Sequence, residues 1–239
     1  MKVLSIGNSF SQDAQRYLSK IAENDGVDLY SVNLYIGGCS LETHYNNMIT
    51  DSLTYSLEVN GNSTGEFTSI KTALESQKWD FVSLQQVSSE SGDYSTFNPY
   101  VKELFDYVRR LCPTAKIVLH QTWAYEDKSE KLLSTPYKSA DEMYNALDRA
   151  YNECLKSLKF YGLIPSGKAM MNAIKFGIGK IHRDTFHASL GAGRYLLGLT
   201  WYKFLTGKKI RGNRFDSFDE PVTDREREIV IKAVDAAFV

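Results

Sequence analysis

"KVLSIGNSFS" (residues 2–11) opens the chain with an apolar run that a glycine-containing turn ends at once. Residues 3–6 are mostly apolar, as in a buried strand, and Gly7-Asn8-Ser9 breaks the run. Ser11 can cap a helix in which apolar residues recur at a 3.6-residue spacing as far as residue 22. The stretch therefore predicts a strand followed by a helix, and it leaves open whether Ser9 belongs to a plain turn or is a reactive serine.

Strand-like and helix-like patterns alternate along the rest of the chain. Further buried strands are predicted at 28–36, 78–86, 115–123 and 162–167, and helices at 41–49, 100–111, 140–161, 168–176, 191–207 and 223–238. A hairpin around Asn60-Gly61 is predicted at 55–70 as an insertion, and the polar stretch 126–139 is predicted as a loop. Five strands separated by helices predict an α/β fold of three α/β/α layers, with a doubly wound, flavodoxin-like parallel sheet. For 239 residues, a single domain over 1–239 is expected.

Composition and charge exclude several classes of protein. Lys and Arg total 28 against 29 for Asp and Glu, so the net charge of −1 offers no field that attracts nucleic acid or an acidic membrane surface. The three widely spaced cysteines predict buried thiols rather than disulfides or a zinc site, and no metal or cofactor is expected. No apolar stretch approaches the ~20 residues of a membrane span. The chain as given is expected to be cytoplasmic, or secreted or periplasmic if a signal peptide was removed, and its oligomeric state stays open.

The carboxyl ends of the predicted strands carry glycines and polar residues. In a doubly wound sheet these ends meet at one edge, and the ligand binds in the crevice outside them. The residues concerned are Asn8 and Ser9 after the first strand, Gly37, Gly38 and Ser40 after the second, Gln85, Gln86 and Ser88 after the third, and Gln121 and Trp123 after the fourth. The candidate substrate contacts among them are Asn8, Ser40, Gln86, Ser88, Gln121 and Trp123. Trp123 and Tyr125 are expected beside the crevice, where their faces would suit a sugar ring.

His187 is the best candidate for a base that would activate Ser9. It follows the last predicted strand, and Asp184 lies three residues before it, so the carboxylate can reach the imidazole within one turn. A serine nucleophile needs both partners, because the histidine takes its proton and the acid fixes the imidazole tautomer. The other histidines are weaker candidates: His182 close to Asp184, His120 inside a predicted strand and His44 on a polar helix.

Three blocks of the sequence together resemble the SGNH (GDSL-like) hydrolase superfamily. "IGNSFS" (6–11) is similar to its nucleophile block, "GGCS" (37–40) to its second block, and "DTFHASLGAGRYLLGLTWYKFLTG" (184–207) to its Asp-x-x-His block. The Gly-Asn-Ser form of the first block, with "LQQVSS" (84–89) and "HQTWAY" (120–125), is similar to a subgroup of uncharacterised bacterial esterase-like proteins. The resemblance implies ester hydrolysis, often the removal of acetyl groups from carbohydrates.

Carried over position by position, the resemblance implies a role for single residues. Ser9 matches the nucleophile, Asp184 the orienting acid and His187 the base. Gly38 matches the glycine whose backbone N–H forms an oxyanion hole with that of Ser9. The third block departs from the family, because "SLQQVSSESGD" (83–93) lacks the asparagine that usually supplies a third donor. Gln85 or Gln86 could supply a similar amide N–H, and Gln85 is favoured.

Each of these signals also has a purely structural explanation. Ser9 could only cap the first helix, Asp184 and His187 could form a surface turn, and Gly37-Gly38 could be a tight turn. Their joint occurrence favours a metal-independent serine esterase that removes acetyl or other short acyl groups from a carbohydrate or small molecule through an acyl-enzyme. The alternative is a carbohydrate-binding or scaffold protein with the same fold and little turnover. A metal-dependent phosphoesterase has less support, because carboxylates and histidines do not cluster at ligand spacing.

Overall fold

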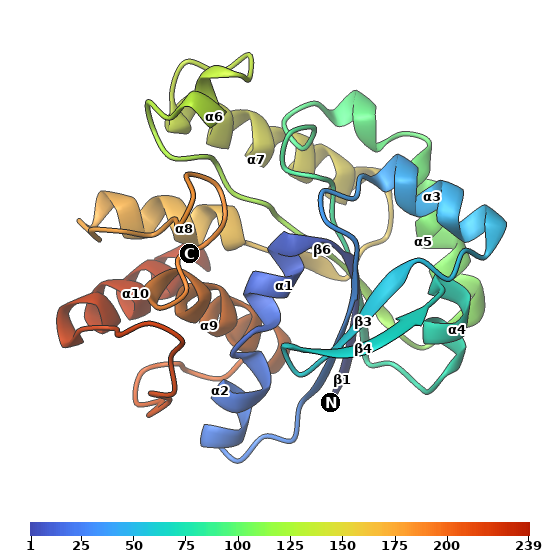
Figure 1. Cartoon of the computed structure of the whole chain (residues 1–239), viewed down its shortest axis with the longest axis horizontal. Coiled ribbons are helices and arrows are strands. Elements are labelled where there is room, and N and C mark those ends of the chain that lie inside the picture. Colours follow the sequence, from blue (N-terminus) through green and yellow to red (C-terminus); the bar gives the residue numbers. More distant parts are fainter.

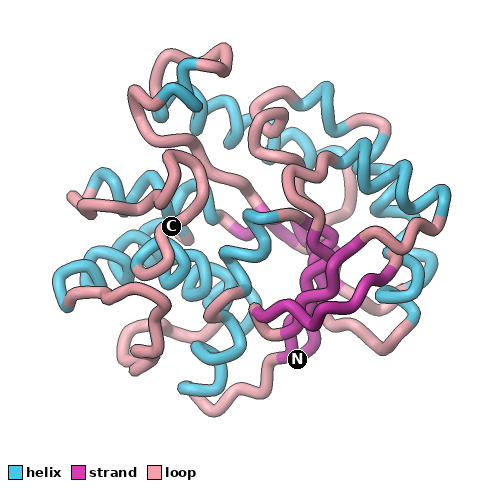
Figure 2. Tube along the Cα trace, viewed as in Figure 1, coloured by secondary structure: helices cyan, strands magenta, loops and turns pink.

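A computed structural model describes the whole chain, residues 1–239, and its centre is a sheet of seven strands (Figure 1, Figure 2). The strands are β1 (Lys2–Gly7), β2 (Tyr30–Tyr35), β3 (Tyr55–Val59), β4 (Asn62–Thr68), β5 (Phe81–Leu84), β6 (Lys116–His120) and β7 (Gly162–Ile164). Their order across the sheet is β4-β3-β2-β1-β5-β6-β7, in which the last five are parallel and the β3–β4 hairpin is antiparallel. The predicted α/β fold with five parallel strands is confirmed, and the predicted hairpin extends the same sheet.

Helices cover both faces of the sheet (Figure 1). On one side lie α1 (Ser9–Gln15), α2 (Leu18–Asn24), α8 (Ser166–Lys175), α9 (Ala192–Thr206) and α10 (Asp224–Ala237). On the other lie α3 (Leu41–Thr50), α4 (Ile70–Glu75) and α5 (Tyr100–Leu111), while α7 (Ala140–Ser157) contributes to both cores. The predicted loop 126–139 contains the short helix α6 (Glu130–Leu133), and a 3₁₀ turn spans Tyr94–Phe97. None of the helices combines the length and the hydrophobicity that a membrane crossing requires.

The central strands bury side chains on both faces. Val3 of β1, Phe81 of β5 and Val118 of β6 belong to the core on the α1 and α9 side, whereas Leu4 belongs to the core on the α5 side. Successive residues of a strand point to opposite faces, so strands covered on both sides read as continuous apolar runs. The predicted burial of the three cysteines is confirmed, and all three are unpaired.

The single helix predicted from Ser11 to residue 22 is in fact two helices. α1 begins at Ser9 and is capped by Asn8, so Ser11 lies in its first turn. The break between α1 and α2 lies where the hairpin turn packs against the chain. There Arg16 Nη1 donates to the Gly61 carbonyl at 3.0 Å, and a Cβ on Gly61 would lie 2.6 Å from the Arg16 carbonyl oxygen. Local periodicity does not report this contact with a segment distant in the sequence.

The parallel register brings three strand ends to one edge of the sheet. Gly7 at the end of β1 pairs with Tyr35 of β2, and Ile6 pairs with Leu84 of β5. The winding reverses at β1, since β2 lies on one side of it and β5, the next parallel strand, lies on the other. This is the topological switch point, where doubly wound sheets bind their ligands.

Candidate active site

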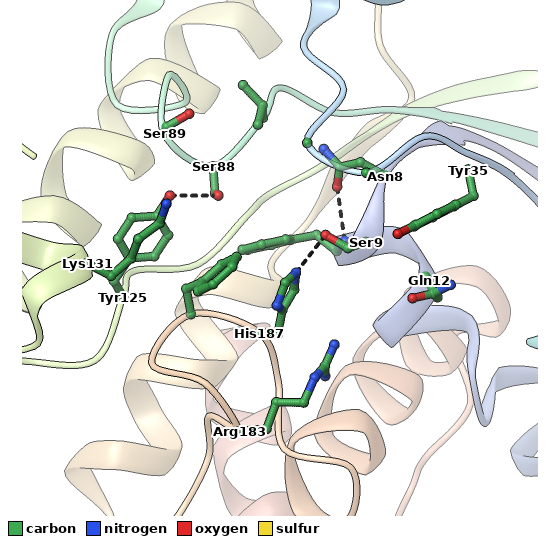
Figure 3. Close-up of a pocket in the computed structure, with 15 residues that line it drawn as sticks. Asn8, Ser9, Gln12, Tyr35, Ser88, Ser89, Tyr125, Lys131, Arg183 and His187 are labelled. Atoms are coloured by element: carbon green, nitrogen blue, oxygen red, sulfur yellow. Dashed lines mark hydrogen bonds between the residues drawn. The ribbon is translucent and has the colours of Figure 1, made fainter. Parts of the chain in front are cut away.

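Ser9 is the first residue of α1, directly after β1, and its hydroxyl oxygen lies 2.8 Å from Nε2 of His187 (Figure 3). The other ring nitrogen, Nδ1, lies 2.7 Å from Oδ2 of Asp184. An ionised carboxylate only accepts hydrogen bonds, so Nδ1–H donates to Asp184 and Nε2 accepts the Ser9 hydroxyl proton. The structure thus brings together the three residues that the sequence singled out. Their arrangement can pass a proton from the hydroxyl to the imidazole.

A tight turn holds Asp184 and His187 in this geometry. Oδ1 of Asp184 accepts the backbone N–H of His187 at 2.8 Å, and a bridge between His182 and Ala188 closes the loop. Thr185 has φ +74°, a left-handed conformation that a β-branched residue adopts only where the surrounding structure enforces it. Burial opposes ionisation of Asp184, but hydrogen bonds from the side chain and backbone of His187 outweigh it and lower the pKa of this carboxyl.

A fully buried carboxylate, Asp13 of α1, ties this turn to the helix that carries Ser9. Its oxygens accept hydrogen bonds from Arg183 Nη1 at 2.9 Å, from Arg194 Nε at 2.9 Å and from the Ala188 N–H at 3.2 Å. Both arginine side chains are themselves mostly buried. Sequence reasoning missed Asp13, because it lies in a polar run near the start of the predicted helix, where an acidic residue is usual and does not signal a buried ion pair.

The backbone N–H groups of Ser9 and of Gly38, which follows β2, have no acceptor within the chain, and both residues line the cavity. Gly38 has φ +65°, a conformation that favours glycine. Free N–H donors beside a reactive hydroxyl can stabilise the negative charge that develops on a carbonyl oxygen under attack.

The two glutamines after β5 do not line the cavity, so the expectation that Gln85 donates there is corrected. Gln85 is buried, its Nε2 donates to Asn8 Oδ1 at 2.6 Å, and its Oε1 lies 2.8 Å from His120 Nδ1. Gln86 is buried too: its Oε1 accepts the Leu41 N–H at 2.9 Å, and its Nε2 donates to the Thr96 carbonyl at 3.0 Å. Gln85 therefore fixes Asn8, the cap beside Ser9, instead of facing a substrate.

Of the six candidate substrate contacts, Asn8 and Ser88 line the cavity and the other four do not. Gln86 has been described above, and the other three residues have partners outside the cavity. Ser40 caps α3 by accepting the Thr43 N–H, Gln121 donates to Asp148, and Trp123 is fully buried against Phe10 with ring centroids 3.9 Å apart. The expectation for these four is corrected, because their polar atoms are already bonded and the indole belongs to the core. Tyr125, by contrast, lines the cavity as expected.

Among the four histidines, His187 alone is bonded to Ser9. The other three are buried, and burial lowers the pKa of His44 and His120 to about 3 and that of His182 to about 4. Nδ1 of His44 lies 2.8 Å from Tyr55 Oη, the two ring nitrogens of His120 face the side chains of Gln85 and Ser166, and Nε2 of His182 faces the Ala124 carbonyl.

The cavity that contains the Ser9 hydroxyl has a volume of about 420 Å³. Besides the residues already described, sequence reasoning missed several side chains of its wall: Gln12 and Tyr35 on one side of Ser9, Ser89 and Lys131 on the other, and Arg183 below (Figure 3). Phe186 also lines the cavity. No aspartate or glutamate belongs to the lining. No group of three His, Cys, Asp or Glu side chains in the chain is placed to hold a metal ion.

Glu58, on the hairpin strand β3, is a second buried carboxylate behind this wall. Its oxygens accept hydrogen bonds from Gln12 Nε2 and, at 2.8 Å, from Asn33 Nδ2. Burial raises the pKa of Glu58 above its ordinary value. The contribution of Glu58 to the free energy of unfolding is therefore fully present below the unfolded-state pKa of the carboxyl, and it is lost as the pH rises through the folded-state pKa.

Replacing Glu58 with glutamine is expected to raise the free energy of unfolding at neutral pH, because a neutral amide avoids the cost of burying a charge. The gain should shrink as the pH falls towards 4.5, the ordinary pKa of the carboxyl. Urea unfolding of both proteins at the two pH values measures the difference. Glu66→Gln, at an exposed position of the same hairpin, is the matched control. A Glu58 variant that is less stable than the wild type at neutral pH would contradict this account.

Comparison with known proteins relates the chain to one family and to one fold. A family model described as "Domain of unknown function (DUF4886)" matches residues 2–237. The crystal structure of a DUF4886 family protein from Bacteroides uniformis superimposes with a TM-score of 0.93 and 32% identity, over 100% of this chain and 94% of that chain. No curated protein matches the chain.

Two more distant structures carry descriptive names. One is described as "a putative SGNH hydrolase" from Slackia heliotrinireducens, with a TM-score of 0.60 and 22% identity over 86% of this chain and 98% of that chain. The other is an acetyl xylan esterase, with a TM-score of 0.56 and 15% identity over 84% of this chain and 98% of that chain. At this level of identity the likeness concerns the fold, which this chain shares with the SGNH hydrolases.

Proposed function

Because the chain belongs to the DUF4886 family and has the fold of the SGNH hydrolases, we propose that it is a serine ester hydrolase that works without a metal. The observation that carries the proposal is the hydrogen-bonded series from Ser9 Oγ through the His187 ring to Asp184, with separations of 2.8 Å and 2.7 Å. A capping role for Ser9 does not require a histidine and a carboxylate in line with its hydroxyl.

In the proposed reaction Ser9 Oγ attacks the ester carbonyl while Nε2 of His187 takes the hydroxyl proton. Asp184 holds the ring through Nδ1–H and stabilises the imidazolium that forms. The backbone N–H groups of Ser9 and Gly38 donate to the oxyanion, and each such donor typically stabilises the transition state by about 3–4 kcal/mol. The alcohol leaves with the proton from His187, and water then repeats the sequence on the acyl-Ser9 ester.

The substrate that we propose carries an acetyl or another short acyl group on a carbohydrate or small molecule. The cavity of about 420 Å³ suits a small ligand, and polar side chains such as Asn8, Gln12 and Ser89 line it. The structural likeness to an acetyl xylan esterase agrees with this choice. A long acyl chain would need an extended apolar channel, and only five of the fifteen lining residues are hydrophobic.

A chain-length series of 4-nitrophenyl esters tests the proposed acyl preference. We expect kcat/KM for the acetate to exceed that for the octanoate by about tenfold, since only five of the fifteen lining residues are hydrophobic. Acetate release from acetylated oligosaccharides would then identify the sugar. A rate for the octanoate equal to that for the acetate would exclude the short-acyl preference, and an absence of hydrolysis of every ester would exclude the function.

A carbohydrate-binding protein with little turnover is the second candidate. The position of Gln85 favours this candidate. Its amide donates to Asn8 and does not line the cavity, so Gln85 does not supply the third, side-chain donor to an oxyanion beside the backbone N–H groups of Ser9 and Gly38. Saturable binding of a sugar, without turnover of any ester and without labelling of Ser9 by a phosphonate, would support this candidate over the esterase.

A further inference from the structure

The wall of the cavity has an unbalanced charge. Lys131 and Arg183 line it and no acidic side chain does, although the chain as a whole carries a net charge of −1. The guanidinium of Arg183 forms an ion pair with the buried Asp13. Lys131 forms no salt bridge, because none of the ion pairs of the chain includes its ammonium group. Among the cationic side chains of the wall, the Lys131 ammonium is therefore the one without a carboxylate partner.

Lys131 is an exposed side chain that lies beside two aromatic rings of the cavity wall. Its Nζ lies 5.6 Å from the ring centroid of Tyr125 and 5.0 Å from that of Phe186. The two rings pack edge to face, and Tyr125 is fixed by burial and by a 2.9 Å hydrogen bond between its hydroxyl and that of Ser88. Cations favour such positions over aromatic faces. In Figure 3 Lys131 lies beside Tyr125, on the side of the cavity opposite Tyr35.

Further hydrogen-bond donors lie at the same end of the cavity. The backbone N–H groups of Ser88 and Ser89 have no acceptor within the chain, and both residues line the cavity with Lys131. An ammonium group and free N–H and O–H donors, without a competing carboxylate, match the needs of an anionic oxygen group. A neutral acyl or sugar group would form no ion pair with the ammonium group of Lys131.

We propose that Lys131 forms a subsite for a carboxylate on the substrate, so that the enzyme prefers esters that carry a second, ionised carboxyl group. The inference rests on the proposed esterase function and adds the class of substrate. Lys131, with the donors of Ser88 and Ser89, binds the carboxylate, while the ester carbonyl reaches Ser9. The subsite discriminates by charge, so the preference weakens as salt screens the ion pair.

Two matched pairs of esters test the subsite on either side of the scissile bond. The first pair, 4-nitrophenyl hemisuccinate and its methyl ester, places the carboxylate on the acyl group. The second pair, 4-acetoxybenzoate and its methyl ester, places it on the alcohol. For one of the pairs we expect kcat/KM to be about tenfold higher for the anionic member at low salt, as for a single solvent-accessible ion pair. Lys131→Gln should remove this preference, so that kcat/KM falls about tenfold further for the anionic member than for the neutral one, and Lys131→Arg should retain it.

Lys128→Gln is the control, because Lys128 is exposed in the same segment and does not line the cavity. Ser9-dependent hydrolysis with equal kcat/KM for both members of both pairs would reject the subsite and leave the esterase intact. A Lys131→Gln variant that loses the neutral esters as strongly as the anionic ones would also reject it. If no ester is hydrolysed, the proposed function fails, and the subsite fails with it.

Discussion

Replacing Ser9 with alanine is expected to lower kcat/KM for 4-nitrophenyl acetate by about 10⁴-fold or more. The variant retains the cavity and the N–H donor of residue 9 but has no oxygen to attack the ester. Initial rates at substrate concentrations well below KM measure the loss. Ser63→Ala is the control, since Ser63 is an exposed serine on β4 outside the cavity.

His187→Ala is expected to cost about as much as Ser9→Ala, and the double variant should lose no more than either single variant. The reason is that a nucleophile without its base, or a base without its nucleophile, performs the same step equally poorly. Multiplicative losses would show that the two residues act independently. A Ser9→Ala variant that keeps most of the wild-type rate would remove Ser9 from the mechanism.

Replacing Asp13 with alanine is expected to lower the free energy of unfolding by about 3–5 kcal/mol. Asp13 is fully buried, and its removal leaves Arg183 and Arg194 in the protein interior without their shared counter-ion. Urea unfolding followed by circular dichroism measures the change. Asp106→Ala is the matched control, because the Lys102–Asp106 pair is more than half exposed and contributes about 0–1 kcal/mol.

The same change is expected to reduce hydrolysis in the fraction that remains folded. Asp13 accepts hydrogen bonds from Arg183 and from the Ala188 N–H, on either side of Asp184 and His187, and it stands on the helix that begins at Ser9. Asp13→Asn keeps the shape of the side chain and should lose less stability than Asp13→Ala. A loss below about 1 kcal/mol for Asp13→Ala would show that the buried ion pair does not hold the turn against α1.

Most of the fold could be predicted from the sequence, because its main signals are local. Alternation of apolar runs with amphipathic helical patterns indicates a doubly wound sheet, and the Asn60-Gly61 turn indicates the hairpin. The division of the helix at Arg16 could not be predicted, since it lies at a contact with Gly61 in the hairpin. Tertiary contacts of this kind override a local period.

In the candidate site, too, the residues with local sequence signals could be predicted, and those whose surroundings depend on distant segments could not. Ser9 follows a strand and His187 lies three residues after Asp184, so both features were visible locally, and the three residues lie together in the structure. The surroundings of Gln85 and Trp123 depend on partners from other segments. Gln85 is held between Asn8 and His120, and Trp123 packs on Phe10, so neither faces the cavity.

The role of Lys131 could not be predicted from local patterns, because the segment 126–139 reads as a polar loop, whereas the structure places the four-residue helix α6 there. The ammonium group lies beside the rings of Tyr125 and Phe186, which follow β6 and precede His187, respectively. Only the folded structure brings these segments together.

Covalent labelling with a fluorophosphonate, read out by peptide mass spectrometry, tests most directly whether Ser9 is an activated nucleophile. The account predicts a phosphonate adduct on the peptide that contains Ser9, formed in the wild type, greatly slowed in His187→Ala and absent in Ser9→Ala. Wild-type protein that stays unlabelled at Ser9 while a known serine esterase reacts under the same conditions would contradict it.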